Sequence, residues 1–173
     1  SRSMQVVNGI ISATRGNHGQ SLAFAASVFG LRATIIVPHG NSREKNAAMR
    51  ALGADVIEQG DDFQDAADFA RQQAVEDDLI MVPPFHPELV RGVASYAMEL
   101  FGDVDNLDRV YVPVGMGSGI CSLITARDAL GLKTEIIGVV AKGADALQQS
   151  FLKGEIHETA TAKTFADGVA CRK

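Results

Sequence analysis

The sequence lacks the features that mark secreted, membrane-spanning and nucleic-acid-binding proteins. It has two cysteines and no tryptophan in 173 residues. Two distant cysteines make no disulfide framework, so we expect a reducing, cytoplasmic setting. No apolar run reaches the roughly 20 residues of a membrane span, and the N-terminus lacks a signal-peptide layout. No basic cluster is present, and the net charge of −5 at pH 7 disfavours nucleic acid and anionic membranes as partners.

The composition is that of a folded protein with a substantial core. Hydrophobic residues make up 46% and charged residues 21%, which excludes disorder. Residues 1–3, which precede Met4, are interpreted as the remnant of an expression tag. The paired prolines at residues 83 and 84 interrupt the pattern. We therefore expect a smaller α/β lobe at residues 4–90 and part of a larger α/β lobe at residues 91–173.

Short apolar runs alternate with helical patterns along both halves. Strands are expected at residues 6–12, 33–37, 55–57, 79–82, 109–114 and 135–140. Helices are expected at residues 17–29, 42–52, 63–75, 88–101, 118–130 and 144–152. Strands that read as continuous apolar runs are typical of parallel sheets covered on both faces. The sequence therefore predicts an α/β protein of two small three-layer lobes with mostly parallel sheets.

The first predicted strand is followed by a glycine-containing turn at residues 14–20, TRGNHGQ. Parallel sheets bind ligands at the carboxyl ends of their strands, beside the start of the next helix. Gly16 and Gly19 let the backbone turn sharply, and the amides at the helix start suit a carboxylate or a phosphate. Asn17 offers a further amide donor. The alternative is an ordinary strand-to-helix turn with Asn17 as the N-cap.

A second glycine turn occupies residues 114–120, VGMGSGI. Its three glycines and its serine predict consecutive N–H groups that cradle an anion. A dinucleotide loop would need glycine in place of Ile120, and an acidic residue after the next strand, where Ala141 stands. A nucleoside-triphosphate loop would need Gly-Lys-Ser/Thr. The sequence thus predicts a phosphate loop of neither nucleotide type, and the alternative is a tight turn of small residues.

No pattern for a metal site or for serine- or cysteine-based hydrolysis is present. The four histidines are far apart in the sequence, and no HxxH or CxxC pair occurs. The Gly-x-Ser-x-Gly elbow of hydrolases is also absent. Cys121 lies at the start of a predicted helix and is expected to pack rather than to react. We therefore expect no metal.

Several segments, taken together and in order, resemble one family. They are residues 14–20, 33–38, 45–54, 84–87, 112–119 and 165–168. Their order and spacing resemble the fold-type II pyridoxal-phosphate-dependent enzymes, and among them the threonine/serine dehydratases. The loop and residues 162–168 are also similar to dehydratase-like proteins linked to hydroxyectoine breakdown. The resemblance implies part of a tryptophan synthase β-like architecture, and a lyase that converts a small amino acid to a 2-oxo acid and ammonia.

The resemblance also implies roles for residues of the two turns. Asn17 would hydrogen-bond the 3-hydroxyl oxygen of pyridoxal 5′-phosphate. The substrate carboxylate would be held by the Thr14 side chain and by four successive backbone amides, those of Arg15, Gly16, Asn17 and His18. The cofactor phosphate would be held by five consecutive residues, Gly115, Met116, Gly117, Ser118 and Gly119. The two turns are expected to face one cleft between the lobes.

The sequence departs from the family pattern at the catalytic amine. The family's Schiff-base lysine lies in a Ser-x-Lys segment upstream of the Gly-Asn-His turn, whereas the 16 residues before Asn17 include no lysine. The late strand whose Ser or Cys meets the pyridine nitrogen also has no counterpart. Met116 replaces a usual glycine and Arg15 a usual small residue. We therefore expect no catalytic residue here, an inactive isolated chain, and weak or absent cofactor binding.

Two functions stay open at this point. One is that of a fragment of a pyridoxal-phosphate-dependent ammonia-lyase. The other is that of a non-catalytic truncated homologue, which binds a small anion or amino acid or interacts with another subunit. A lobe without its flanking strands exposes apolar edges that pair with other chains, so we also expect a homo-oligomer.

Overall fold

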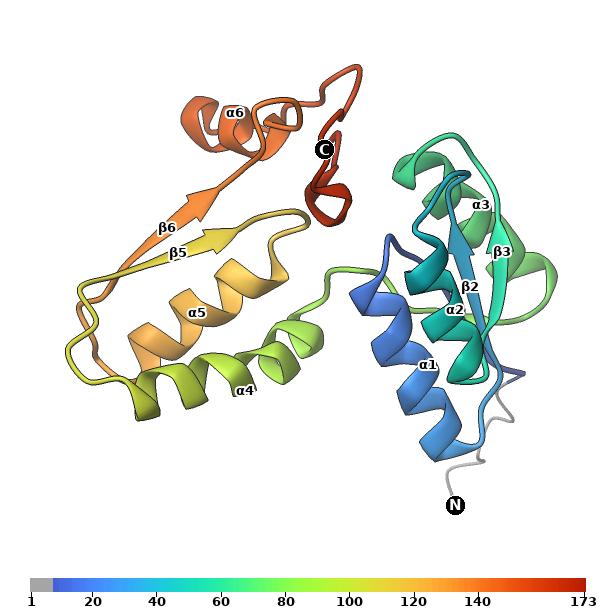
Figure 1. Ribbon diagram of the computed structural model, residues 1–173, viewed down its shortest axis with the longest axis horizontal. Helices are drawn as coiled ribbons and strands as arrows, with labels where there is room; N and C mark the ends of the chain where they lie inside the picture. Colours follow the sequence, from blue (N-terminus) through green and yellow to red (C-terminus); the bar gives the residue numbers. More distant parts are fainter. Residues whose placement is uncertain (1–7) are drawn as a thin grey trace. The chain divides into compact units, whose positions relative to one another are not determined.

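The computed structural model describes residues 8–173, which divide into two compact units (Figure 1). Unit 1 ends at Pro84 and unit 2 begins at Phe85, directly after the paired prolines. The first predicted strand, residues 6–12, begins outside the described residues. Within them the strand runs from Ile10 to Ala13.

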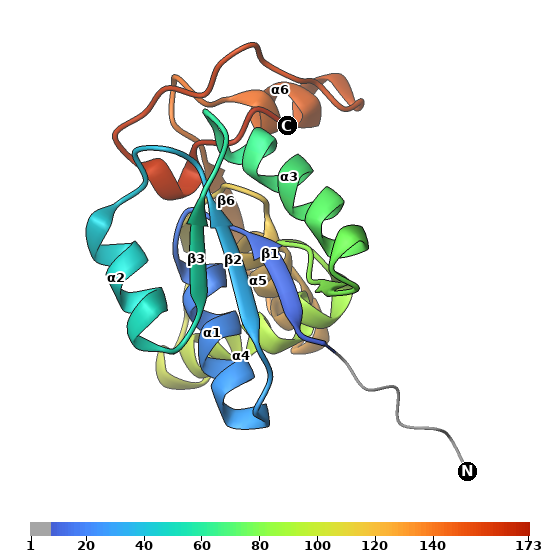
Figure 2. The same ribbon diagram turned by 90° about the vertical axis from the view of Figure 1, so that its right-hand side faces the viewer.

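Unit 1 is a parallel four-stranded sheet with helices on both faces (Figure 2). Its strands are β1 (Ile10–Ala13), β2 (Ala33–Val37), β3 (Asp55–Glu58) and β4 (Ile80–Met81), in the order β3-β2-β1-β4. Its helices are α1 (Asn17–Phe29), α2 (Arg43–Ala51) and α3 (Phe63–Glu76). Helices α1 and α2 pack on the face that carries Ile35, and α3 packs on the face that carries Ile11 and Ile36. Both faces of the sheet are thereby covered.

Strand β1 lies at the point where the chain changes direction across the sheet. From β1 the chain proceeds through α1 to β2 on one side, and it returns through α3 to β4 on the other side of β1. In open α/β sheets, ligands bind at the carboxyl ends of the strands that flank such a switch. The segments after β1 and β4 are therefore where a ligand is expected, and this edge of unit 1 is called the binding edge below.

Unit 2 is built on a two-stranded parallel sheet, β5 (Arg109–Pro113) and β6 (Glu135–Val139). Its helices are α4 (Pro87–Asp103), α5 (Ser118–Ala129), α6 (Ala146–Lys153) and the short 3-10 helix η1 (Asp167–Val169). Helices α4 and α5 pack on one sheet face around Val112 and Leu123 (Figure 1). Tyr111 points to the other face, because side chains alternate along a strand, and is 62% exposed.

The predicted α/β class with parallel sheets is confirmed in both units. All three predicted layers are present in unit 1, whereas in the described part of unit 2 the sheet is covered by helices on one face. The helix at residues 17–29 and the strand at residues 33–37 have the predicted bounds. The helix predicted from residue 144 begins at Ala146, because Ala141 and Ala144 first form an isolated bridge.

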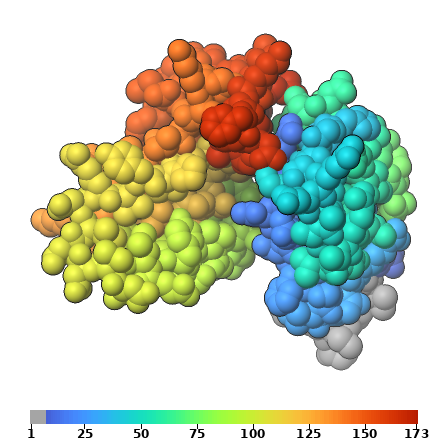
Figure 3. Space-filling view, in the orientation of Figure 1, coloured from blue at the N-terminus to red at the C-terminus, as the bar shows by residue number. Residues whose placement is uncertain are grey.

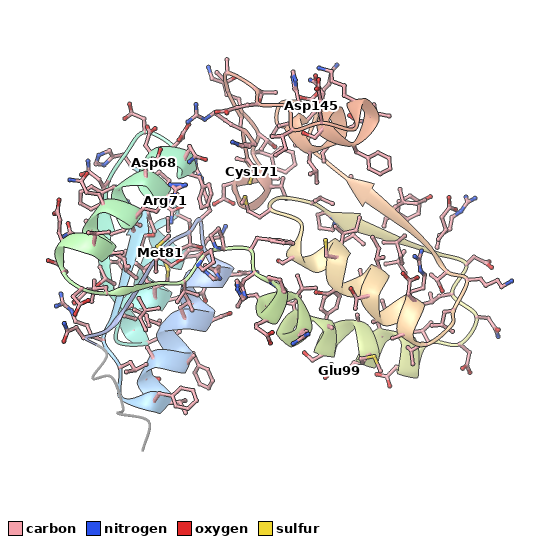
Figure 4. All side chains as sticks on the ribbon, turned by 180° about the vertical axis from the view of Figure 1, so that it is seen from behind. Asp68, Arg71, Met81, Glu99, Asp145 and Cys171 are labelled. Atoms are coloured by element: carbon pink, nitrogen blue, oxygen red, sulfur yellow. The ribbon has the colours of Figure 1, made fainter. Side chains whose placement is uncertain are left out.

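The charged side chains of the helices point away from the two cores. Asp68 and Arg71 pair on the outer face of α3, and Glu99 lies on the outer face of α4 (Figure 4). Within residues 8–173, every helix is too short or too polar to cross a membrane. The apolar stripes of the helices are therefore explained by packing against the sheets.

Candidate functional site

The turn between β1 and α1 is held together from inside by Thr14. Its side chain is buried, and its Oγ1 accepts hydrogen bonds from the backbone N–H groups of Gly16 (2.9 Å) and Gly19 (3.3 Å). A Cβ added at Gly19 would overlap the Met49 sulfur and the Thr14 methyl. Glycine is therefore required at this position, and the turn has one tightly packed conformation.

Helix α1 begins without a side-chain cap. Gly16 is the N-cap residue and Asn17 is the first helical residue, so the alternative in which Asn17 caps the helix is wrong. Asn17 is exposed, and its side-chain amide makes no hydrogen bond to the described residues. The first turn contains no acidic residue. The Gly16 amide is occupied by Thr14, which leaves the amides of Asn17 and His18 to meet a ligand.

A hydrogen-bonded chain connects the ends of β1 and β4 to this turn. Ser12 Oγ donates to the Val82 carbonyl oxygen at 2.6 Å and lies 3.0 Å from His18 Nε2. Either Ser12 Oγ or His18 Nε2 can be the donor in their contact, depending on the tautomer of the imidazole. Burial lowers the pKa of His18 and so favours the neutral imidazole. In the sequence, the one sign of these hydrogen bonds was Ser12, a polar residue at the end of an apolar strand.

Lys45 of α2 lies against the same turn. A Cβ added at Gly16 would stand 2.7 Å from Cδ of Lys45, so the aliphatic stem of the lysine covers this glycine. Ser42 caps α2 by accepting from the Lys45 backbone N–H at 3.4 Å, which fixes where the lysine leaves the helix. The sequence placed Lys45 in a helix but gave no signal of its contact with Gly16.

The second glycine turn lies in unit 2, between β5 and α5. Gly117 has a φ of +95°, a conformation that favours glycine, and is the N-cap of α5. The C-terminal segment packs against this loop (Figure 3). A Cβ on Gly115 would stand 2.9 Å from the Gly168 carbonyl oxygen and 3.7 Å from Cys171 Sγ (Figure 4). The segment at residues 165–168, one of those that carry the family resemblance, therefore contacts the glycine loop through Gly168.

Helix α4 supports the start of α5. The Tyr96 hydroxyl donates to the Gly119 carbonyl oxygen at 3.0 Å, and burial raises the pKa of Tyr96, which keeps this donor protonated. Ser122 Oγ lies 2.8 Å from the Val90 carbonyl oxygen and 2.7 Å from that of Ser118. The sequence pattern indicated Tyr96 only as part of an apolar helix face, so its role at the loop was missed.

The helix starts of the molecule fall into two kinds. Helices α2, α3 and α4 are capped by Ser42, Asp62 and His86, and each has an acidic residue in its first turn. Helix α6 has neither a side-chain cap nor an acid in its first turn. Helices α1 and α5 share this feature, and in addition they follow the two glycine turns. Their free N–H groups and positive dipole ends suit an anion. The loop at residues 115–119 fits a phosphate group on this evidence.

Comparison with known proteins agrees with this arrangement. The family described as pyridoxal-phosphate dependent enzyme matches residues 4–173. The chain belongs to this family. The predicted resemblance to fold-type II, threonine/serine dehydratase-like enzymes is thereby confirmed.

Two curated relatives show how much of the enzyme length the chain spans. It is 34% identical over 170 residues to a biosynthetic L-threonine dehydratase of Pasteurella multocida, which covers 98% of this chain and 33% of that enzyme. It is 34% identical over 161 residues to the L-threo-3-hydroxyaspartate ammonia-lyase of Saccharomyces cerevisiae, which covers 92% of this chain and 49% of that enzyme. The chain thus spans a third to a half of these relatives.

A solved structure gives the same result for the fold. The processed form of threonine deaminase isoform 2 from Solanum lycopersicum matches with a TM-score of 0.87 and 33% identity, over 99% of this chain and 50% of that chain. The predicted tryptophan synthase β-like fold of the family, present in part, is confirmed.

For this member of the pyridoxal-phosphate dependent enzymes, the sequence-predicted residues form two groups. Thr14, Arg15, Gly16, Asn17 and His18 lie together at the binding edge of unit 1. Gly115, Met116, Gly117, Ser118 and Gly119 form one loop in unit 2. Among the described residues, no three or more His, Cys, Asp or Glu side chains are grouped to hold a metal ion. The chemistry of both groups is that of anion binding by backbone amides and neutral polar side chains.

Proposed function

We propose that the chain carries the substrate turn and the cofactor-phosphate loop of a threonine/serine dehydratase-like ammonia-lyase. Such an enzyme converts a β-hydroxy amino acid to a 2-oxo acid and ammonia. The observation that carries the proposal is the pair of uncapped, acid-free helix starts at α1 and α5, each behind a glycine turn. The names of the relatives, lyases of threonine and of 3-hydroxyaspartate, support a β-hydroxy amino acid as the substrate.

In unit 1, the turn after β1 would receive the amino acid. The Thr14 hydroxyl accepts two backbone hydrogen bonds and keeps its own proton for the substrate carboxylate. The backbone amides of Arg15, Asn17 and His18 are the further donors, while Gly16 shapes the turn. The exposed Asn17 side chain would meet the 3-hydroxyl oxygen of the cofactor. These roles follow the family resemblance residue by residue.

In unit 2, the loop from Gly115 to Gly119 would hold the cofactor phosphate. The first amides of α5 supply the donors, and Tyr96 and Ser122 keep the helix start in place. Pyridoxal phosphate, when bound, supplies an electron sink for the reaction at the substrate α-carbon. The residues of this chain bind and orient the two anionic ends of the reactants.

The catalytic amine is the part of the proposal that these residues do not supply. The 16 residues before Asn17 contain no lysine, so the base that removes the α-proton would come from outside this sequence. The second candidate is a non-catalytic module that binds a small anion or amino acid. Formation of 2-oxo acid from threonine or serine by the chain with added pyridoxal phosphate would contradict the expected inactivity.

The phosphate loop can be tested with Ser118→Asp. Aspartate is favourable at a helix start, so α5 should keep its structure, whereas its carboxylate would repel a bound phosphate. Titration of the chain with pyridoxal phosphate and with inorganic phosphate, followed by amide NMR shifts, should perturb residues 115–119. Ser118→Asp should abolish these shifts. Gln64→Asp adds the same charge to the first turn of α3 and should leave them unchanged.

Because cofactor binding without the catalytic amine is expected to be weak, the titration extends to concentrations at which weak binding is detected. The proposed function fails if neither phosphate compound perturbs residues 115–119 at these concentrations. It also fails if Ser118→Asp binds both compounds as well as the unchanged chain does. Retention of the amide spectrum in Ser118→Asp shows that the helix start is intact, so that loss of binding is an effect of charge.

A further inference from the structure

Arg15 is a cation at the substrate turn without a partner for its charge. Its Nε is buried and makes no hydrogen bond, and no ion pair involves Arg15 among residues 8–173. Three other arginines of unit 1 do have partners: Arg32 with Asp55, Arg50 with Glu58 and Arg71 with Asp68. Arg43 has none, but it is exposed and solvated. A guanidinium atom that is removed from water without a partner is costly, which indicates that a ligand supplies the partner.

The turn around Arg15 has enough hydrogen-bond donors for one carboxylate without the guanidinium. The substrate carboxylate already has the Thr14 hydroxyl and the free amides of the turn. The first turn of α1 adds no acid, and the stem of Lys45 covers Gly16 from α2. The Arg15 guanidinium is therefore a donor group beyond those that an amino acid with a neutral side chain would use.

We propose that Arg15 is a specificity-determining residue that binds a second carboxylate, on the side chain of the substrate. This inference rests on the proposed function, and it narrows the substrate class to β-hydroxy amino acids with an acidic side chain. A planar guanidinium matches a carboxylate with two parallel hydrogen bonds, so the site distinguishes an acidic side chain from the neutral amide of the same shape. The family's usual small residue at this position could not make that distinction.

The inference can be tested with L-aspartate and L-asparagine, which differ in side-chain charge but hardly in shape. Calorimetric or NMR titration of the full 173-residue chain should show that aspartate binds about tenfold more tightly than asparagine. Arg15→Gln should remove the preference, and Arg15→Lys should keep part of it, because the charge stays but the fork is lost. Arg43→Gln removes the same charge from an exposed position of unit 1 and should keep the full preference.

The proposal is overturned if the unchanged chain binds the two amino acids equally or binds neither. It is also overturned if Arg15→Gln keeps the preference for aspartate. If inorganic phosphate instead shifts the amides of residues 14–18, and Arg15→Gln weakens these shifts, the guanidinium serves a phosphate and the proposal is overturned as well. The phosphate titration of Ser118→Asp is read at different residues, so failure of the proposed function is distinguished from failure of this inference.

Discussion

The parallel sheet of unit 1 is buried much more completely than the parallel sheet of unit 2. In unit 1, Ile11, Ile35 and Ile36 are fully buried, since helices cover both faces of four strands. In unit 2, the sheet has two strands, and Val112 is its one buried strand residue within the described chain. Tyr111 and Val139 are exposed on the same short sheet. Unit 1 therefore buries its sheet on both faces, whereas unit 2 leaves part of its sheet exposed. Unit 1 also has exposed apolar side chains, on the outer side of α1 at Phe24, Val28 and Phe29.

The difference extends to how each glycine turn is held. The glycine turn of unit 1, residues 14–20, is fixed by Thr14 inside the turn and by the contact of Ser12 with His18. The glycine loop of unit 2, residues 114–120, is supported by α4 through Tyr96 and by the C-terminal segment, residues 168–171. We expect unit 1 to be the more stable part, and its turn to be the more rigid of the two.

The largest expected change in stability is that of a glycine replacement in unit 1, which we compare with a glycine replacement in unit 2. Gly19→Ala would force a methyl into the Met49 and Thr14 side chains, and we expect it to destabilise unit 1 by about 3 kcal/mol. Gly92→Ala fills open space in α4 and should stabilise unit 2 by about 0.5–1 kcal/mol. Amide hydrogen exchange, read at β2 and at β5, measures each unit separately.

The outcome decides whether the units are independent. Gly19→Ala should speed exchange in β2 with little change in β5, and Gly92→Ala should slow exchange in β5 with little change in β2. If Gly19→Ala instead lowers protection equally in β2 and β5, the units unfold as one body and the comparison between them is wrong.

The parts of the fold that were predictable were those with a local signal. The strand at residues 33–37 is a continuous apolar run, and the helix that ends before Gly30 has a left-handed glycine at its C-cap. The two glycine turns could be predicted because glycine adopts backbone conformations and close approaches that other residues do not tolerate. The hydrogen bond of Tyr96 to Gly119 and the contact of Lys45 with Gly16 could not be predicted, because each joins residues more than 20 positions apart that only the tertiary fold brings together.

The exposed apolar side chains of unit 2 should cause the chain to self-associate. Phe151, Leu152 and Ile156 lie close together in sequence around the end of α6, and all three are largely exposed. Phe151→Asp should weaken association by about 1–2 kcal/mol, because it removes apolar contact area and adds charge. Val75→Asp, at a single exposed position of unit 1, is the control. Light scattering over a range of concentrations should show a smaller mass for Phe151→Asp only. A monomer at high concentration for the unchanged chain would contradict the prediction.

The smallest expected effect is a pH dependence confined to unit 1. Burial holds the pKa of His18 below its ordinary value of 6.5, so below that pH the unfolded chain binds a proton that the folded chain does not. The free energy of unfolding of unit 1 should therefore fall as the pH is lowered from 7 to 5.5, by at most about 1.3 kcal/mol in all. His18→Gln, whose amide can still donate to Ser12, should remove this slope, and His39→Gln, at an exposed position, should keep it. Urea unfolding followed at unit 1 amides measures the slope. An equal slope in His18→Gln would show that the buried imidazole does not couple unit 1 to pH.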